Sequence, residues 1–243
     1  MIITKNEAQH IRRCLESVEW AKEIVIVDAF STDETIAIGR DFTDKIFQNH
    51  FQDFSSQKNF ALSKCRYNWV LSLDADEVLS PELKEKIKSL DPDGLSGYRI
   101  RRQTYIFGRL FKYGGHAHDM PLRLFDKSKE AYFYQPIHES LKISGAIGFI
   151  EEPILHYSSS NLDEYMRKLN LYTELDAKFL LEKKVRFSYF KMICKPIAKF
   201  FQRYIVQRGY LDGYEGLIFY LMSGFDEFIK WSKYWQYIKR GQL

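Results

Sequence analysis

The chain has 243 residues, 45% of them hydrophobic and 28% charged, with a formal net charge of +4. This composition excludes a disordered chain and is sufficient for a sizeable core. Three widely spaced cysteines, Cys14, Cys65 and Cys194, argue against a disulfide framework or a zinc ribbon and favour a reducing compartment. No apolar run approaches the roughly 18 residues of a membrane span, so we expect neither secretion nor transmembrane insertion.

Short strands and helices alternate through the first 90 residues. Apolar runs predict strands over residues 2–4, 24–27, 44–47 and 69–73. Cap signals predict helices that begin after Asn6, after Ser31 with Glu34 as its capping-box partner, at Ser55, and after Ser80 with Pro81 in the first position. Such alternation predicts a parallel, doubly wound α/β sheet with helices on both faces.

The pattern changes further along the chain. Short β-like runs between Gly97 and Tyr157 indicate an α+β completion of the same domain. Asn161 and Glu164 form a capping-box pattern, after which we expect helix to the C-terminus with breaks at Pro196 and Gly209. We therefore divide the chain into a catalytic-size domain over residues 1–160 and a helical region over residues 161–243.

Polar residues follow the predicted strands where ligands bind in open α/β sheets. Asp74-Ala75-Asp76 ends an apolar strand, and two carboxylates there can hold a divalent cation that bridges phosphates, although a solvated acidic turn has the same sequence. Asp28 ends a neighbouring strand and could hydrogen-bond a base or ribose, or simply be a turn aspartate that caps the following helix. Together these residues predict a ligand site at one edge of the sheet.

Several motifs in order resemble family 2 glycosyltransferases of the GT-A fold, which is a Rossmann-like nucleotide-diphospho-sugar transferase domain. They are Ile2-Ile3-Thr4-Lys5-Asn6-Glu7, I-x-x-C-L-x-S over residues 11–17, Val25-Ile26-Val27-Asp28, Ser31 to Thr35, Gln57 to Ala61, and Leu71 to Glu77. Pro136-Ile137-His138-Glu139, Ile154 to Tyr157, Tyr165 to Asn170 and Tyr204 to Gly213 are similar to bacterial inner-core β-1,4-glucosyltransferases that act on the heptose of lipopolysaccharide. The first strand is a few residues shorter than the family pattern.

The resemblance implies an inverting, metal-dependent transfer of a hexose, glucose, from a UDP-linked donor to lipopolysaccharide core heptose. It implies the base near Thr4, Glu7 and Asp28, and the diphosphate near Lys58, Asp74 and a Mg²⁺ or Mn²⁺ ion held by Asp76. Lys58 near a helix start adds positive charge where phosphate is already favoured, although a solvated lysine is the alternative. His156 would complete the metal shell, or serve as a structural histidine.

Inverting transfer needs a carboxylate that takes the proton of the acceptor hydroxyl. We expect Glu139 in this role, with Asp119 in reserve and an ordinary surface glutamate as the alternative. His116 and His118 have a spacing compatible with zinc but no nearby third ligand, so we assign them to the acceptor side. We place His138 there too, with Arg123, whose guanidinium suits a phosphorylated sugar.

The C-terminal region predicts a different partner, because residues 161–243 contain 15 Lys and Arg against 9 Asp and Glu. Apolar residues recur at helical spacing and alternate with Lys191, Lys195, Lys199 and Arg203. The apolar set is Phe187, Phe190, Ile193, Ile197, Phe200, Phe201 and Tyr204. This pattern favours an anionic membrane surface, with residues 217–222, Trp231 and Trp235 as further anchors, over simple packing on the catalytic domain.

No nucleic-acid-binding motif accompanies the basic stretch, so we do not expect a nucleic-acid partner. We expect a cytoplasmic enzyme, peripheral on the inner face of the bacterial inner membrane. Two alternatives are a family 2 transferase for another envelope glycan or lipid-linked sugar, and a catalytically silent, membrane-docked binder of nucleotide sugars.

Overall fold

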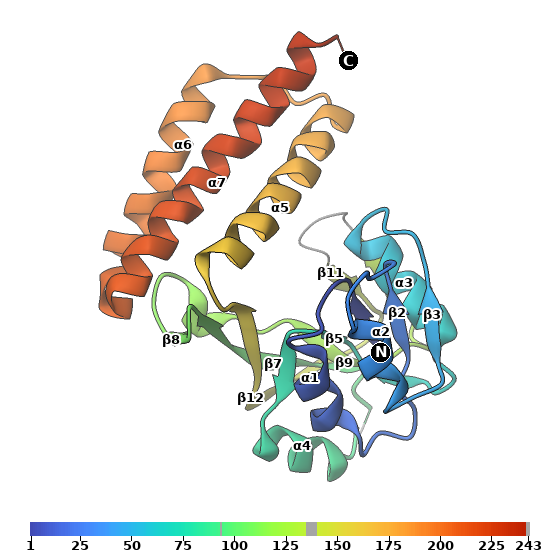
Figure 1. Cartoon of the computed structure of the whole chain (residues 1–243). Coiled ribbons are helices and arrows are strands. Elements are labelled where there is room, and N and C mark those ends of the chain that lie inside the picture. The colour runs from blue at the N-terminus through green and yellow to red at the C-terminus, as the bar shows by residue number, and fades with distance from the viewer. Residues whose placement is uncertain (93, 135–139, 242–243) are drawn as a thin grey trace. The chain divides into compact units, whose positions relative to one another are not determined.

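The computed structural model describes residues 1–92, 94–134 and 140–241 (Figure 1). The chain divides into two compact units. Unit 1 comprises Met1–Gln103 with His118–Tyr157, and unit 2 comprises Thr104–Ala117 with Ser158–Leu243.

Unit 1 contains the expected parallel sheet. Its strand order is β3-β2-β1-β5, and all three pairings are parallel. The strands are β1 (Ile2–Thr4), β2 (Ile26–Asp28), β3 (Ile46–Gln48) and β5 (Leu73–Asp74). The short first strand pairs with a neighbour on each side, with Thr4 opposite Asp28 and Ile3 opposite Asp74. The polar residues that end β1, β2 and β5 therefore meet at one edge of the sheet.

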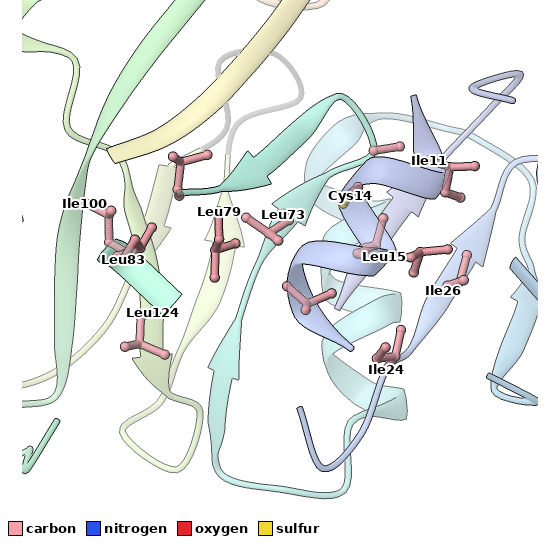
Figure 2. Close-up of a cluster of buried hydrophobic side chains, with 14 of the residues drawn as sticks. Ile11, Cys14, Leu15, Ile24, Ile26, Leu73, Leu79, Leu83, Ile100 and Leu124 are labelled. Carbon is pink, nitrogen blue, oxygen red and sulfur yellow. The ribbon is translucent and has the colours of Figure 1, made fainter. Parts of the chain in front are cut away.

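Helices cover the sheet because successive strand residues point to opposite faces. Ile2 and Ile26 pack with Leu15 of α1 (Ile11–Val18) in one buried cluster. Figure 2 labels Leu15 and Ile26 in this cluster, and burying a side chain such as Leu15 contributes about 1.5–3 kcal/mol. Ile3 and Val27 pack with Ala61 of α3 (Phe54–Lys64) in a second cluster. Two further helices complete this set, α2 (Thr35–Arg40) and α4 (Pro81–Lys88).

Two of the predicted helix caps are wrong. Helix α1 begins at Ile11 rather than after Asn6, and α2 begins at Thr35 rather than after Ser31. The side chains instead join the two loops: Asn6 Oδ1 accepts the Thr32 amide at 2.8 Å, and Ser31 Oγ accepts the Asn6 amide at 2.8 Å. These contacts span about 25 residues, so a local cap pattern did not reveal them. The Ser80 cap is confirmed, since its hydroxyl accepts the Leu83 amide ahead of Pro81.

The apolar run 69–73, predicted as one strand, belongs to two sheets. Residues Trp69–Leu71 form β4 and pair antiparallel with β9 (Leu122–Asp126), whereas β5 pairs with β1. The change occurs at Ser72, whose amide still bonds to the Arg123 carbonyl, while the Leu73 amide bonds to that of Met1.

The second sheet has the order β4-β9-β7-β12-β6, with β8 on β7. Its other strands are β6 (Glu77–Leu79), β7 (Gly97–Ile106), β8 (Arg109–Phe111) and β12 (Ile147–Ser159). A separate hairpin pairs β10 (Tyr132–Tyr134) with β11 (Ser140–Lys142). A 3₁₀ turn, η1, spans His116–His118.

Unit 2 is built on three helices, α5 (Leu162–Glu182), α6 (Tyr189–Phe201) and α7 (Gly213–Lys239). Helix α7 packs against both α5 and α6 (Figure 1). Gly224 permits a close approach, because a Cβ there would lie 3.0 Å from the Pro196 carbonyl oxygen. The predicted break at Pro196 is wrong, since this residue lies inside α6, which continues into the π-helical turn η2 (Gln202–Val206). The predicted Asn161 cap is confirmed, because its side chain accepts the Glu164 amide.

Candidate active site

The acidic turn between β5 and β6 is surrounded by buried cations. Lys58 Nζ lies 2.9 Å from Asp74 Oδ1, and Arg123 Nη2 lies 2.6 Å from Asp74 Oδ2. Burial would raise the pKa of Asp74, but the charges of Arg123 and Lys58 outweigh it and hold the pKa well below its ordinary value. Asp74 is therefore an ionised carboxylate at neutral pH.

Lys58 is not the solvated lysine that its sequence alone allowed. Lys58 is only 1% exposed. Its ammonium group lies beside Asp74 and 5.7 Å from the centre of the Phe133 ring. Helix α3 holds it there, capped by Asp53 and tied through Asn59 to both backbone groups of Phe133. The residue thus adds a fixed positive charge to the site.

Glu77 anchors the turn from its far side. It is fully buried, and its carboxylate accepts the Asp74 amide at 3.0 Å, Arg123 at 2.6 Å and Arg102 at 3.1 Å. Arg102 also donates to Asp119 at 2.7 Å, which extends the network to the residue held in reserve as a base. The sequence prediction did not include Glu77 or Arg102. In the sequence, the only signal for this network is the third acid, Glu77, which directly follows Asp74-Ala75-Asp76.

Asp76 lies beside His156 because β6 pairs with β12. His156 is opposite Glu77 in that ladder, and the Tyr157 amide donates to the Asp76 carbonyl at 2.9 Å. His156 Nε2 lies 3.6 Å from Asp76 Oδ2, too far for a hydrogen bond. Ligand bonds to a Mg²⁺-sized ion are about 2.1 Å, so one cation can contact both atoms.

Two further observations bear on a metal ion. His156 Nδ1 is buried and has no hydrogen-bond partner among the described residues. Within the same ranges, no group of three or more His, Cys, Asp or Glu side chains is arranged to hold a metal. Asp76 and His156 thus fit a cation that takes its other ligands from elsewhere, as a diphosphate would supply.

The predicted donor residues Thr4 and Asp28 lie on adjacent strands. Asp28 is fully buried, and its carboxylate accepts both the amide of Ser31, at 2.8 Å, and the Ser31 hydroxyl. These bonds hold the turn that follows β2, but the alternative that Asp28 caps the following helix is wrong, because α2 begins at Thr35 with Glu34 at its N-cap position. The buried Thr4 hydroxyl has no hydrogen-bond partner in the described part of the chain. The Glu7 amide donates to Thr35 Oγ1 at 2.8 Å, which holds the loop after β1 against the start of α2.

The predicted acceptor residues are divided between the two units. Arg123 is buried in the carboxylate network described above. His116 belongs to unit 2 and packs against Phe111 and Phe219, whereas His118 is exposed and belongs to unit 1. Glu139 and His138 lie outside the described residues.

Comparisons with known proteins agree with this geometry. The family model Glycosyl transferase family 2 matches residues 1–156. The chain is 30% identical over 244 residues to the lipopolysaccharide core biosynthesis glycosyltransferase LpsC of Rhizobium meliloti, covering 97% of this chain and 90% of that protein. It is also 30% identical over 251 residues to an uncharacterized glycosyltransferase of Rickettsia felis, covering 96% and 87%.

A solved structure shares the fold. The mannosyltransferase PcManGT of Pyrobaculum calidifontis, determined with GDP-Man and Mn²⁺, matches with a TM-score of 0.55 at 12% identity, over 96% of this chain and 85% of that one. The expected GT-A architecture with C-terminal helices is thereby confirmed. The chain belongs to glycosyltransferase family 2.

Proposed function

We propose that this protein transfers glucose, with inversion, from a UDP-linked donor to the inner-core heptose of lipopolysaccharide. The observation that carries the proposal is the Asp74–Asp76 turn at the carboxyl edge of the parallel sheet, with His156 3.6 Å from Asp76. The relative LpsC, named for lipopolysaccharide core biosynthesis, supports the acceptor class.

Each part of the site has a task in this reaction. A bound Mg²⁺ or Mn²⁺ supplies the charge that stabilises the departing diphosphate. Asp76 and His156 would hold that ion, and Lys58 and Arg123 keep Asp74 ionised. Thr4, Glu7 and Asp28 border the base and ribose at the ends of β1 and β2.

Proton transfer and acceptor binding fall to other residues. Glu139 takes the proton from the attacking heptose hydroxyl, with Asp119 as the reserve base. His118 and His138 bind the acceptor, whereas the buried Arg123 keeps its place between Asp74 and Glu77. The transfer domain spans residues 1–160 and works at the inner face of the bacterial inner membrane, held there by residues 161–243.

The metal-binding role of Asp76 is tested by Asp76→Ala. We expect the wild type to bind UDP-glucose more tightly with Mn²⁺ than with EDTA, and we expect the variant to lose this difference. The transfer rate of the variant should fall at least roughly 100-fold, because an uncompensated charge on the leaving diphosphate raises the barrier. Asp41→Ala is the control, since Asp41 lies on the surface of unit 1 in an exposed pair with Arg12. Calorimetry measures donor binding, and mass spectrometry of a heptose-terminated core fragment measures transfer.

Two results would contradict the proposal. Full metal-dependent transfer by Asp76→Ala would remove the metal assignment. A wild type that binds UDP-glucose but transfers to no core, glycan or lipid acceptor would be a nucleotide-sugar binder rather than an enzyme.

A further inference from the structure

Helix α6 exposes a row of large apolar side chains. Phe190, Ile193, Ile197 and Phe201 recur at intervals of three or four residues, which places them on one side of the helix. Their exposed fractions are 74%, 49%, 54% and 54%. We call these four residues the α6 outer face.

The rest of the predicted apolar stripe points into unit 2. Phe187 packs against Trp231 and Tyr234, and Phe200 stacks on Tyr204. Trp231 is itself buried, so the expectation that it is an interfacial anchor is wrong. The stripe therefore has two parts, one that packs the bundle and one that meets solvent.

Helix α7, which packs on α6, exposes a second row. Tyr214, Ile218, Leu221 and Phe225 follow the same spacing, with exposed fractions between 42% and 86%. Monomeric proteins rarely leave so many large apolar side chains exposed on neighbouring elements unless the surface binds something. The two rows belong to one compact unit.

The charges in the segment that carries the α6 outer face are of one sign. Residues 183–211 contain eight Lys and Arg and no Asp or Glu. Lys183, Lys184 and Arg186 lie exposed just before α6, and Lys191 and Lys195 on α6 lie 5.8 Å and 5.5 Å from the centre of the Trp231 ring. The occupant of this surface must accept apolar side chains and carry negative charge.

The cations also argue against a second copy of the chain. A two-fold interface through the α6 outer face would bring residues 183–211 of both copies toward each other, and this segment contains no acid to neutralise its cations. An anionic bilayer offers both a lipid interior for the apolar rows and phosphates for the cations. Among the described residues, no helix is long and apolar enough to cross a bilayer, so this contact would run along the surface.

We infer that the α6 outer face and the exposed row of α7 form a docking surface for anionic phospholipid, with Phe190 and Ile197 inserted among the lipids. The inference deepens the membrane location in the proposed function and rests on it. The structure also removes two of the four cations that the sequence predicted to bind lipid. Arg203 donates to Ser223 of α7 at 3.3 Å, and burial lowers the pKa of Lys199, so these two belong to the packing of the bundle.

Vesicle binding by the full-length chain tests the inference. The probes are vesicles containing phosphatidylglycerol and vesicles of phosphatidylcholine alone. Phe190→Gln/Ile197→Gln should lower the partition coefficient for anionic vesicles at least about 10-fold, because both apolar insertions are lost. Leu162→Gln/Leu171→Gln is the matched control, since these α5 side chains are 49% and 44% exposed, and it should bind as the wild type does.

A charge variant tests the electrostatic part. Lys183→Gln/Lys184→Gln/Arg186→Gln should weaken binding to anionic vesicles and flatten its salt dependence, because exposed charges are screened over about 8 Å at physiological salt. All three side chains are exposed, so the fold should persist.

Three outcomes would overturn the inference. They are equal binding by the wild type and Phe190→Gln/Ile197→Gln, equal wild-type binding to both vesicle types, and a lipid-free dimer that the same substitutions dissociate. Measuring UDP-glucose binding and transfer to a water-soluble core fragment in each variant separates the two proposals. Transfer without vesicle binding refutes only the docking surface, and vesicle binding without transfer refutes only the enzyme.

Discussion

Glu77 holds the acidic turn from inside the protein. It is fully buried and accepts hydrogen bonds from the Asp74 amide and two arginines, so its negative charge compensates the buried Arg123 and the partly buried Arg102. Such a network is costly to break because the surviving partners stay buried without their counter-charge. The motif Asp74-Ala75-Asp76 predicts a ligand site at this turn, but it does not indicate the carboxylate that holds the turn in position.

We predict that Glu77→Gln lowers the free energy of unfolding by about 3–5 kcal/mol, the usual cost of removing one partner of a buried pair. Urea denaturation followed by circular dichroism measures this. Asp41→Asn makes the same chemical change in an exposed ion pair and should cost less than about 1 kcal/mol. Equal stability of Glu77→Gln and the wild type would show that the arginines find other partners.

At the scale of elements, α7 organises unit 2 because it packs on both α5 and α6. Asp226 of α7 is mostly buried between them and accepts a hydrogen bond from Tyr165 of α5 at 3.4 Å. Burial raises the pKa of Asp226 to about 6, and the negative charge of Asp176 on α5 acts in the same direction. The positive charges of Lys199 on α6 and Lys230 on α7 oppose this shift. This carboxylate therefore titrates near neutral pH.

The sign of the resulting pH dependence is determined by that shift. The folded state binds the proton of Asp226 more tightly than the unfolded chain does, so this proton stabilises the fold. Its contribution to the free energy of unfolding is complete below about pH 4 and is lost as pH rises through about 6. We predict that the stability of the wild type relative to Asp226→Asn falls between pH 4 and pH 7, measured by thermal unfolding across that range. Asp163→Asn changes an exposed acid of α5 and should follow the wild-type profile. Parallel wild-type and Asp226→Asn profiles would contradict the prediction.

At the scale of the whole molecule, the chain enters unit 2 twice. Residues Thr104–Ala117 belong with the C-terminal helices, and Ile106 and Phe111 of this segment are buried in a cluster with Tyr220 of α7. Tyr220 also donates to the Tyr113 carbonyl at 3.0 Å. A cut after residue 160 would therefore remove the partner of a buried apolar segment.

We predict that a chain ending at Ser160 aggregates and binds a hydrophobic dye more strongly than the full chain, because Ile106 and Phe111 become exposed. Light scattering and dye fluorescence measure this. The same truncated chain with Ile106→Thr/Phe111→Ser should aggregate less if these two side chains are the cause. A monomeric, dye-free truncated chain would show that residues 1–160 fold without the helices.

The sequence by itself determined the features that depend on neighbours along the chain. Apolar runs marked the strands of the parallel sheet, and Ser80-Pro81 and Asn161 marked the starts of α4 and α5. Because parallel strands place their carboxyl ends at one edge, the order of elements was sufficient to bring Thr4, Asp28 and Asp74 together. The family motifs added a prediction for the chemistry of the site, and identified the family, which the match to residues 1–156 confirms.

Only the tertiary structure decided features that depend on residues far apart in sequence. The run 69–73 divides between two sheets because Leu71 pairs with Leu124 whereas Leu73 pairs with Ile2. Lys58 and Arg123 look like surface cations in sequence, yet their charges are compensated inside the protein by Asp74 and Glu77. Helical spacing identified the apolar stripe of α6, but its inward and outward parts were decided by α7, because a helix buries whichever side another element covers.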